Sequence, residues 1–305
     1  MRVLLTGATG YVGSYVLRAL LRQGHTPRCL VRTRTDDLTV ADDRIERAVG
    51  DVTDPASLAG AFDDCDAVVH LVGIIEESPR RGVTFERLHV EGTRHVVNAA
   101  RDVGIDRFVH MSANGARPDN ATDYQRTKWE AEQIVTDAGF GHWTIFRPAL
   151  LFGEPDPGRP EFSSRLLTEL VRPFPILPVF GDGQYKLQPV HATEVADAFV
   201  QALTAEAAHK QTYVAAGPDR FSYLEVLDRI ARGAGLSPKT KVHVPLALAR
   251  LGVHTAGRVG LLPISPAQFE MLVEGNTGDE TAFYRDFTLS PVAFTPENLQ
   301  YLQSM

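Results

Sequence analysis

Short apolar runs rich in Val, Ile and Leu alternate, along the first half of the chain, with longer segments whose apolar residues recur at helical spacing. Strands of a parallel sheet have such continuous apolar runs, because helices bury both faces of the sheet. We expect strands at 2–5, 26–32, 45–49, 66–72, 106–112 and 142–147, and helices at 12–22, 55–62, 84–103 and 125–138. Parallel neighbours need right-handed crossovers, so the pattern predicts an α/β fold with a doubly wound parallel sheet.

The composition of the chain changes after Pro148. Residues 153–189 are rich in proline and glycine, which do not allow long helices or strands. Residues 186–191 then resemble a returning strand, and 193–203 resemble a helix. These changes predict two domains. The expected divisions are a dinucleotide-binding Rossmann domain at 1–152 and 186–216, and a smaller substrate or cap domain at 153–185 and 217–305.

The chain has 305 residues, of which 44% are apolar and 23% charged, as is typical of a globular protein. Its formal net charge is −7 and no long basic run occurs, so we expect no nucleic-acid partner. Cys29 and Cys65 lack metal-ligand spacing, which predicts two core thiols and no metal site. We expect His70 and His110 in the core and His191 in a structural role. No signal peptide or long apolar run is present, which predicts a cytoplasmic protein.

A glycine-rich turn follows the first expected strand and opens the first helix, with the pattern TGxxGxxG at residues 6–13. Glycines permit a tight turn and a close approach to a pyrophosphate, and the helix N-terminus offers unpaired N–H groups to the anion. Within a βαβ unit this pattern predicts a dinucleotide site. The expected cofactor contacts are Gly7, Thr9, Gly10, Tyr11, Val12 and Gly13.

The residues after the second and third strands bear on the choice of nucleotide. Arg32 lies about 20 residues beyond the glycines, where an acid suits the ribose of NAD and an arginine suits the 2′-phosphate of NADP. This favours NADP(H) over NAD(H), although the nearby Asp36 and Asp37 leave NAD open. Asp51 could accept from an adenine amino group or cap the following helix, and Asp54 is better placed for the cap.

Ser112, Tyr124 and Lys128 form a candidate catalytic set. Ser112 ends the fifth strand, at the edge where open α/β sheets bind ligands. Tyr124 and Lys128 stand four residues apart on one face of a helix. The lysine charge would lower the pKa of the phenol and make it a usable general acid or base, while Ser112 would hold the substrate oxygen. A half-buried ring beside a solvated lysine is the alternative that the spacing alone leaves open.

As an ordered set, these motifs resemble the short-chain dehydrogenase/reductase superfamily, in its extended or atypical branch of NAD-dependent epimerase/dehydratase-like architecture. The resemblance covers about the first 205 residues. It rests on the glycine motif and on Gly50-Asp51-Val52, His70-Leu71-Val72-Gly73, Glu91-Gly92-Thr93, Phe108-Val109-His110-Met111-Ser112, Tyr124-xxx-Lys128 and Arg147-Pro148-Ala149-Leu150-Leu151-Phe152-Gly153. The short loop at 113–123 departs from most extended enzymes and is a feature of atypical members.

The resemblance implies how the adenine half of the cofactor would be held. The backbone at residues 9–12 would cradle the pyrophosphate, and Arg32 would meet the 2′-phosphate. Asp51 and Val52 would border the adenine.

The resemblance also implies how the reactive half would be held. Lys128 would bind the hydroxyls of the nicotinamide ribose, and Tyr124 would be the acid or base with Ser112 as its partner. The other expected contacts along the phosphates, ribose and nicotinamide are Leu71, Val72, Gly73, Pro148 and Leu150.

Within the superfamily the chain most resembles the group similar to the NADPH-binding accessory subunit of respiratory complex I, through its short loop and the segments 174–178 and 188–196. Such proteins bind the nucleotide firmly and are not known as turnover enzymes. Two hypotheses follow: an NADP(H)-dependent oxidoreductase or epimerase acting on a small molecule in the cleft between the domains, or a non-turnover NADPH-binding accessory or regulatory protein.

Residues 244–264 are rich in leucine and carry few cations. Such a segment predicts a helix that covers the substrate cleft. The alternative is a peripheral contact with a membrane or a membrane protein, which would place the protein at the inner face of a membrane.

Overall fold

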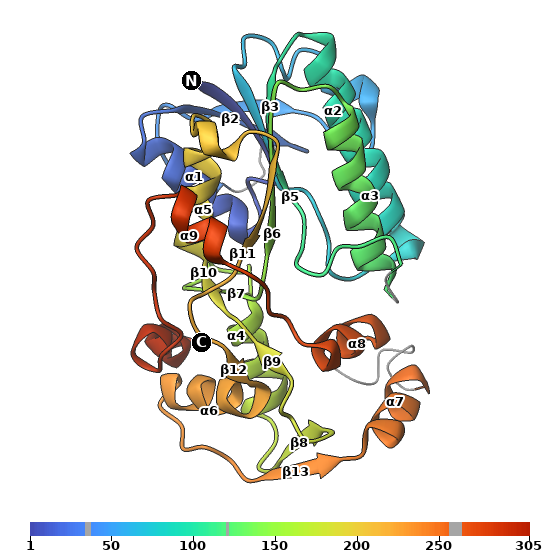
Figure 1. Ribbon diagram of the computed structural model, residues 1–305, viewed down its shortest axis with the longest axis vertical. Coiled ribbons are helices and arrows are strands. Elements are labelled where there is room, and N and C mark those ends of the chain that lie inside the picture. The colour runs from blue at the N-terminus through green and yellow to red at the C-terminus, as the bar shows by residue number, and fades with distance from the viewer. Residues whose placement is uncertain (34–37, 120–121, 256–263) are drawn as a thin grey trace. The chain divides into compact units, whose positions relative to one another are not determined.

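The computed structural model describes residues 1–33, 38–119, 122–255 and 264–305 (Figure 1). Contacts divide the chain into two compact units. The first contains Met1–Pro148, Ala192–Ala215 and Glu280–Ser290, and the second contains Ala149–His191, Ala216–Asp279 and Pro291–Met305. This division places residues 186–191 in the second unit and 280–290 in the first, whereas the boundaries expected from the sequence have both the other way round.

A seven-stranded sheet forms the centre of the first unit, with the order β11-β6-β5-β4-β1-β2-β3 and every pair of neighbours parallel. Its strands are β1 (Arg2–Thr6), β2 (Thr26–Val31), β3 (Glu46–Val49), β4 (Ala67–His70), β5 (Arg107–Met111), β6 (His142–Pro148) and β11 (Gln211–Ala215). The chain builds outward from β1 in one direction and then returns to β4 on the other side of it. The predicted doubly wound fold is therefore confirmed, with its switch point between β1 and β4.

Helices cover both faces of this sheet, as Figure 1 shows: α1, α5 and α9 lie on one side, and α2 and α3 lie on the other. Their bounds are α1 (Tyr11–Arg22), α2 (Gly92–Asp102), α3 (Asp123–Asp137), α5 (Ala192–Gln201) and α9 (Thr281–Asp286). A π-helical turn, η3 (Glu86–Glu91), leads into α2, and single 3₁₀ turns are η1 (Pro55–Leu58), η2 (Pro79–Arg81) and η5 (Glu206–Ala208).

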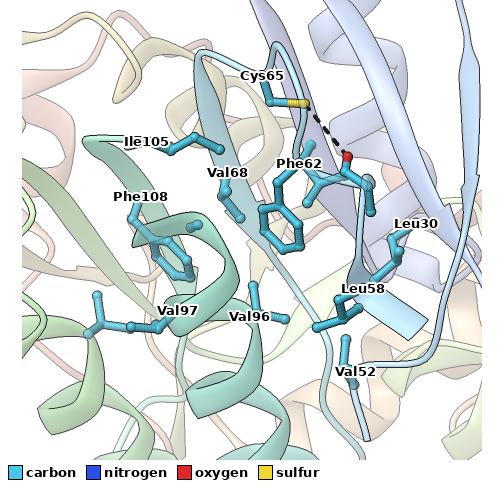
Figure 2. Packing of buried hydrophobic residues seen from close by; sticks show 14 of the residues in the cluster. Leu30, Val52, Leu58, Phe62, Cys65, Val68, Val96, Val97, Ile105 and Phe108 are labelled. Carbon is cyan, nitrogen blue, oxygen red and sulfur yellow. Dashed lines mark hydrogen bonds between the residues drawn. The ribbon is translucent and has the colours of Figure 1, made fainter. Parts of the chain in front are cut away.

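An apolar core fills the space between the sheet and the α2–α3 layer (Figure 2). Val68 and Phe108 come from the strands, and Val96 and Val97 come from α2. Cys65 joins this core, and both cysteines are buried free thiols, as the sequence predicted. This face is apolar where the strands begin and becomes polar at their carboxyl ends, which is where the candidate site lies.

The second unit has a core of its own, formed around α6 by residues such as Phe152, Leu227 and Phe294. Its helices are α4 (Phe162–Leu166), α6 (Tyr223–Gly233), α7 (Leu246–Thr255) and α8 (Pro266–Glu274), with the turns η4 (Leu167–Val171) and η7 (Glu297–Ser304). Its short strands are β7 (Leu151–Phe152), β8 (Leu177–Phe180), β9 (Lys186–Leu187), β10 (Val190–His191), β12 (Phe221–Ser222) and β13 (Lys241–Val244). Over the described ranges, no helix is both long and apolar enough to cross a bilayer.

Two expected elements were wrong. The segment 186–191 does not return to the large sheet: β9 pairs with β12 and β10 with β7, while β11 is the added edge strand beside β6. Pro189, which has no N–H, separates the two short strands. The helix expected at 55–62 is only the turn η1, and Gly60 with a φ of +75° follows it.

Candidate functional site

The glycine turn joins β1 to α1 at the switch point of the sheet. Gly7 has a φ of +77°, and a Cβ there would lie 3.2 Å from the Leu71 carbonyl carbon and the Val72 nitrogen. A Cβ on Gly13 would lie 2.1 Å from the Gly7 oxygen, so only glycine lets α1 start this close to the turn. Exposed Gly10 is the N-cap of α1, and no side chain in the described ranges caps the helix. These features fit a pyrophosphate at the N-terminus of α1.

The predicted adenine-end residues lie in two places. Arg32 is exposed directly after β2, whereas Asp36 and Asp37 lie outside the described residues. One oxygen of Asp51 accepts from the N–H and the hydroxyl of Thr53, both at 2.8 Å. Asp51 thus forms the turn after β3, and the predicted cap on η1 is made by Asp54, which accepts from the Ala56 N–H at 3.1 Å.

Val52 is buried in the core beside this turn. Its carbonyl lies 2.8 Å from Nδ1 of His95 on α2, so the helix fixes the backbone at the expected adenine border.

Leu71, Val72 and Gly73 run past the glycine turn directly after β4. The Leu71 N–H lies 3.3 Å from both the carbonyl oxygen and the hydroxyl of Thr6, which fastens this segment to the end of β1. The exposed fraction rises from buried Leu71 to exposed Gly73. At Gly73 a Cβ would lie 2.9 Å from Nζ of Lys128, so the glycine leaves the space that the ammonium group occupies.

The candidate catalytic set gathers at the carboxyl end of β5. Lys128 is 3% exposed, and its ammonium donates to the Met111 carbonyl at 2.9 Å. The next residue, Ser112, is 1% exposed, and its hydroxyl finds no hydrogen-bond partner among the described residues. Tyr124 is half-buried one helical turn before Lys128. A buried hydroxyl beside a buried cation is a ready partner for a ligand oxygen.

Helix α3 has a capped start and an ion pair with the sheet. Thr122 caps the helix by accepting from the Gln125 N–H. Farther along, Glu132 accepts from two nitrogens of Arg147 on β6, at 2.8 and 2.5 Å. The helix that carries Tyr124 and Lys128 is therefore capped at its start and bonded to β6 farther along.

The expected effect of Lys128 on the tyrosine pKa was wrong for the free protein. Burial raises the pKa of Tyr124 to about 12, because the phenolate would lose its solvation. Burial also lowers the pKa of Lys128 to about 8, although Glu132 opposes the shift. The ammonium is engaged by the Met111 carbonyl, and the free protein therefore holds a protonated phenol beside a readily neutralised amine.

Pro148 and Leu150 fall in different units. Pro148 ends β6, and its carbonyl accepts from the Asn114 N–H at 3.0 Å, which holds the loop after Ser112. Leu150 belongs to the second unit, where its carbonyl accepts from the Val190 N–H at 2.9 Å.

Buried histidines form the polar end of the core, which was predicted for His70 and His110. His70 bridges the hydroxyls of Thr6 and Thr93, at 2.7 and 3.1 Å, and stacks on His110 with ring centroids 5.5 Å apart. Burial lowers the pKa of His70 to about 3. His191 is half-buried in the second unit, where its ring packs edge-on against Phe152.

Sequence reasoning missed His89. Phe85, His89 and Thr93 recur every four residues, and all three are buried. This spacing already marks a histidine on the inner face of a helix. Within the described part of the chain, no group of three metal-ligating side chains is close enough to hold a metal ion.

The comparisons with known proteins agree with this geometry. The profile of the NAD dependent epimerase/dehydratase family matches residues 3–216, which is more than half of the chain. The chain belongs to this family. The resemblance to the extended short-chain dehydrogenases/reductases is confirmed, and the family supports NAD(P) as the cofactor and an NAD(P)-dependent oxidoreductase or epimerase as the class of protein.

Two relatives and one solved structure illustrate the range of the family. The NADH-ubiquinone oxidoreductase 40 kDa subunit of Neurospora crassa is 28% identical over 98% of this chain and 78% of its own length. Ceramide reductase of Caulobacter vibrioides is 28% identical over 84% of this chain and 76% of its own. The fold matches UDP-glucuronic acid 4-epimerase from Bacillus cereus in complex with NAD, with a TM-score of 0.74 and 19% identity over 100% of this chain and 96% of the other.

Proposed function

We propose that the chain is an NADP(H)-dependent oxidoreductase or epimerase whose acid/base residue is Tyr124, with Ser112 and Lys128 completing the site. The observation that carries the proposal is the buried Ser112 hydroxyl, which has no partner among the described residues and follows directly on the Met111 carbonyl that binds the buried Lys128 ammonium. Open α/β sheets bind their ligands at this edge.

Each residue then has a chemical role on a small molecule that carries a carbonyl or a secondary alcohol. The bound nicotinamide supplies or accepts the hydride. Ser112 donates its hydroxyl to the substrate oxygen, and Tyr124 gives that oxygen a proton during reduction or takes it during oxidation. Lys128 leaves the Met111 carbonyl for the ribose hydroxyls, and its charge beside the phenol then favours proton transfer.

The preference for NADP(H) rests on Arg32. The guanidinium is exposed in the first position after β2, where a 2′-phosphate would lie, and its forked donors suit phosphate oxygens. We expect Arg32→Ala to weaken the binding of NADPH at least 10-fold and to change the binding of NADH by less than 2-fold. Arg101→Ala, on the exposed face of α2, is the matched control. Equal losses for the two nucleotides would refute the phosphate role.

The catalytic assignment is tested with a panel of aldehydes, ketones and quinones and with NADPH as the reductant. We expect Tyr124→Phe to lower turnover by about 10² to 10⁴, as loss of a general acid does, and to keep NADPH affinity within 2-fold. Tyr185→Phe is the control, because this buried hydroxyl in the second unit also finds no partner among the described residues. Full activity of Tyr124→Phe would refute the assignment.

The second candidate is a non-turnover NADPH-binding accessory or regulatory protein, which the likeness to the 40 kDa subunit over 98% of the chain favours. In that case, NADPH would stay bound through purification and no substrate in the panel would be reduced.

The accessory function would include peripheral contact with a membrane through residues 244–264, of which 256–263 lie outside the described residues. Leu248 and Leu251 on α7 support it, since they are 63% and 64% exposed. Co-sedimentation with inner-membrane vesicles tests this contact. We expect Leu248→Ser with Leu251→Ser to abolish sedimentation, and unchanged sedimentation would refute the contact.

A further inference from the structure

His89 lies between the segment after β4 and helix α3, and it contacts both. The side chain belongs to η3 and is 1% exposed. Its Nε2 lies 3.1 Å from the Ile74 nitrogen and 3.1 Å from the Ile74 oxygen. Its Nδ1 lies 2.9 Å from the hydroxyl of Thr127, the residue before Lys128.

A neutral imidazole bonds both Ile74 and Thr127 in either tautomer. With the ring proton on Nδ1, Nε2 accepts from the Ile74 N–H. Nδ1–H then donates to the Thr127 hydroxyl, which in turn donates to the Asp123 carbonyl at 2.8 Å. With the ring proton on Nε2, the ring donates to the Ile74 carbonyl and Nδ1 accepts from the Thr127 hydroxyl. Both tautomers are neutral, and both join Ile74 to Thr127.

The same ring touches the surroundings of the candidate catalytic residues. It packs edge-on against Tyr124, with ring centroids 5.6 Å apart, and stacks on Phe85 at 5.3 Å. A Cβ on Gly73 would lie 3.5 Å from Nε2 of His89 and 2.9 Å from Nζ of Lys128. The His89 ring and the Lys128 ammonium therefore both lie next to the Gly73 backbone.

We propose that His89 is a positioning residue, whose neutral imidazole joins Thr127 on α3 to Ile74. This link holds the Lys128 ammonium next to Gly73 and the Tyr124 ring against the imidazole. The inference rests on the proposed function, since it gives His89 the task of aligning the two residues for the nucleotide and the substrate oxygen.

The electrostatics of the pocket support a neutral ring. Lys128 faces His70 of β4, His110 of β5 and His89 of η3, while Glu132 lies one turn farther along its own helix. Burial, together with repulsion by Lys128, lowers the pKa of His89 to about 2. The imidazole can therefore hold the lysine in place without adding a competing charge.

The test uses His89→Phe, which keeps a ring against Phe85 and Tyr124 but removes both hydrogen bonds, and Thr127→Val, which removes only the hydroxyl. Thr136→Val is the matched control, because this hydroxyl on the same helix bonds only the Gln133 carbonyl among the residues that the structure describes. The first readout is the NADPH dissociation constant of the full chain. The second is the pH dependence of Lys128 acetylation by acetic anhydride without nucleotide, followed by mass spectrometry.

Only the neutral amine reacts, so the acetylation rate of Lys128 should rise with pH and level off above its pKa. In the wild type, we expect this break in the pH profile near pH 8, the lowered pKa of Lys128. In His89→Phe and Thr127→Val, the break should move up by at least one pH unit towards the value of about 10.4 for a free lysine. NADPH affinity should fall at least 10-fold, and the double variant should lose no more than His89→Phe alone. Thr136→Val should behave as the wild type. A residue that only stabilised the fold would lower the melting temperature without moving the break.

An unchanged or lower break in a folded His89→Phe, with NADPH affinity within 2-fold, would overturn the proposal. Where His89→Phe does not fold, Thr127→Val decides alone, and wild-type behaviour of that variant overturns it. Absence of NADPH binding by the wild type would refute the proposed function, and the acetylation readout would still test whether His89 holds Lys128.

Discussion

Gly73→Ala is the smallest change that should disable the candidate site without unfolding the protein. The new Cβ would lie 2.9 Å from Nζ and 3.4 Å from Cε of Lys128. Ordinary van der Waals contacts begin near 3.5 Å, so the end of this side chain has to move. Because the end of a lysine is flexible and the φ of Gly73 is not positive, we expect the free energy of unfolding to change by less than about 1 kcal/mol.

The cost should fall on nucleotide binding instead. The displaced ammonium would no longer reach the ribose hydroxyls, for which the proposed function has it leave the Met111 carbonyl. A hydrogen bond to a charged group contributes about 1.5 to 3 kcal/mol, which corresponds to a loss of about 10- to 150-fold in NADPH affinity. Gly252→Ala on α7 is the control, since a Cβ there meets nothing within 4 Å.

A double-mutant cycle distinguishes a displaced lysine from a direct clash with the nucleotide. NADPH titration by fluorescence is carried out on Gly73→Ala, Lys128→Ala and the double variant. If the effect passes through Lys128, Gly73→Ala should cost almost nothing once Lys128 is alanine. A full loss in that background would show a direct clash. Wild-type affinity of Gly73→Ala would refute the reasoning about Lys128 altogether.

Three further predictions concern stability, measured by urea unfolding. Glu132→Gln leaves Arg147 beside a neutral amide, and we expect a loss of about 2 to 3 kcal/mol, contradicted by wild-type stability. Burial raises the pKa of Glu161 to about 7. The protonated carboxyl therefore contributes its full stability below about pH 4, and the free energy of unfolding falls by about 3 kcal/mol as the pH rises through 7. Glu161→Gln should remove that dependence. His70 has a lowered pKa of about 3, so stability is lost as the pH falls from about 6.5 to 3. His70→Gln should reduce this slope by about 1.4 kcal/mol per pH unit, and an equal slope would refute the assignment.

Features with a local physical cause could be predicted from the sequence. The strand before Gly7 and the helix after Gly10 lie where the apolar pattern and the glycines placed them. The i, i+4 spacing of Tyr124 and Lys128 was sufficient to put both on one helix face, and the end of β5 was sufficient to place Ser112 at the ligand edge. None of these predictions needed long-range contacts.

Features that depend on distant partners could not be predicted in the same way. The predicted lowering of the Tyr124 pKa was wrong, because burial raises this pKa to about 12. The Lys128 ammonium, expected to lower it, donates to the Met111 carbonyl instead. The edge strand at 211–215 was missed, because the local sequence does not show which strand it pairs with, and its partner β6 lies more than 60 residues earlier. His89 was missed because its two partners, Ile74 and Thr127, are 15 residues before it and 38 residues after it.

The contacts that hold α3 distinguish the site from the rest of the core. Apolar contacts alone would hold this helix at a lower cost in free energy. Buried polar groups lose their solvation and stabilise the fold only when each one has its hydrogen-bond partner. Helix α3 packs Val135 into the apolar core and is also held by the Lys128–Met111 and Arg147–Glu132 pairs and by the His89–Thr127 hydrogen bond. These directional bonds, together with the packing, fix the rotation of the helix about its axis. A helix that must present a phenol and an ammonium to one ligand requires that fixed rotation, and this explains why the polar groups gather at the carboxyl ends of the strands.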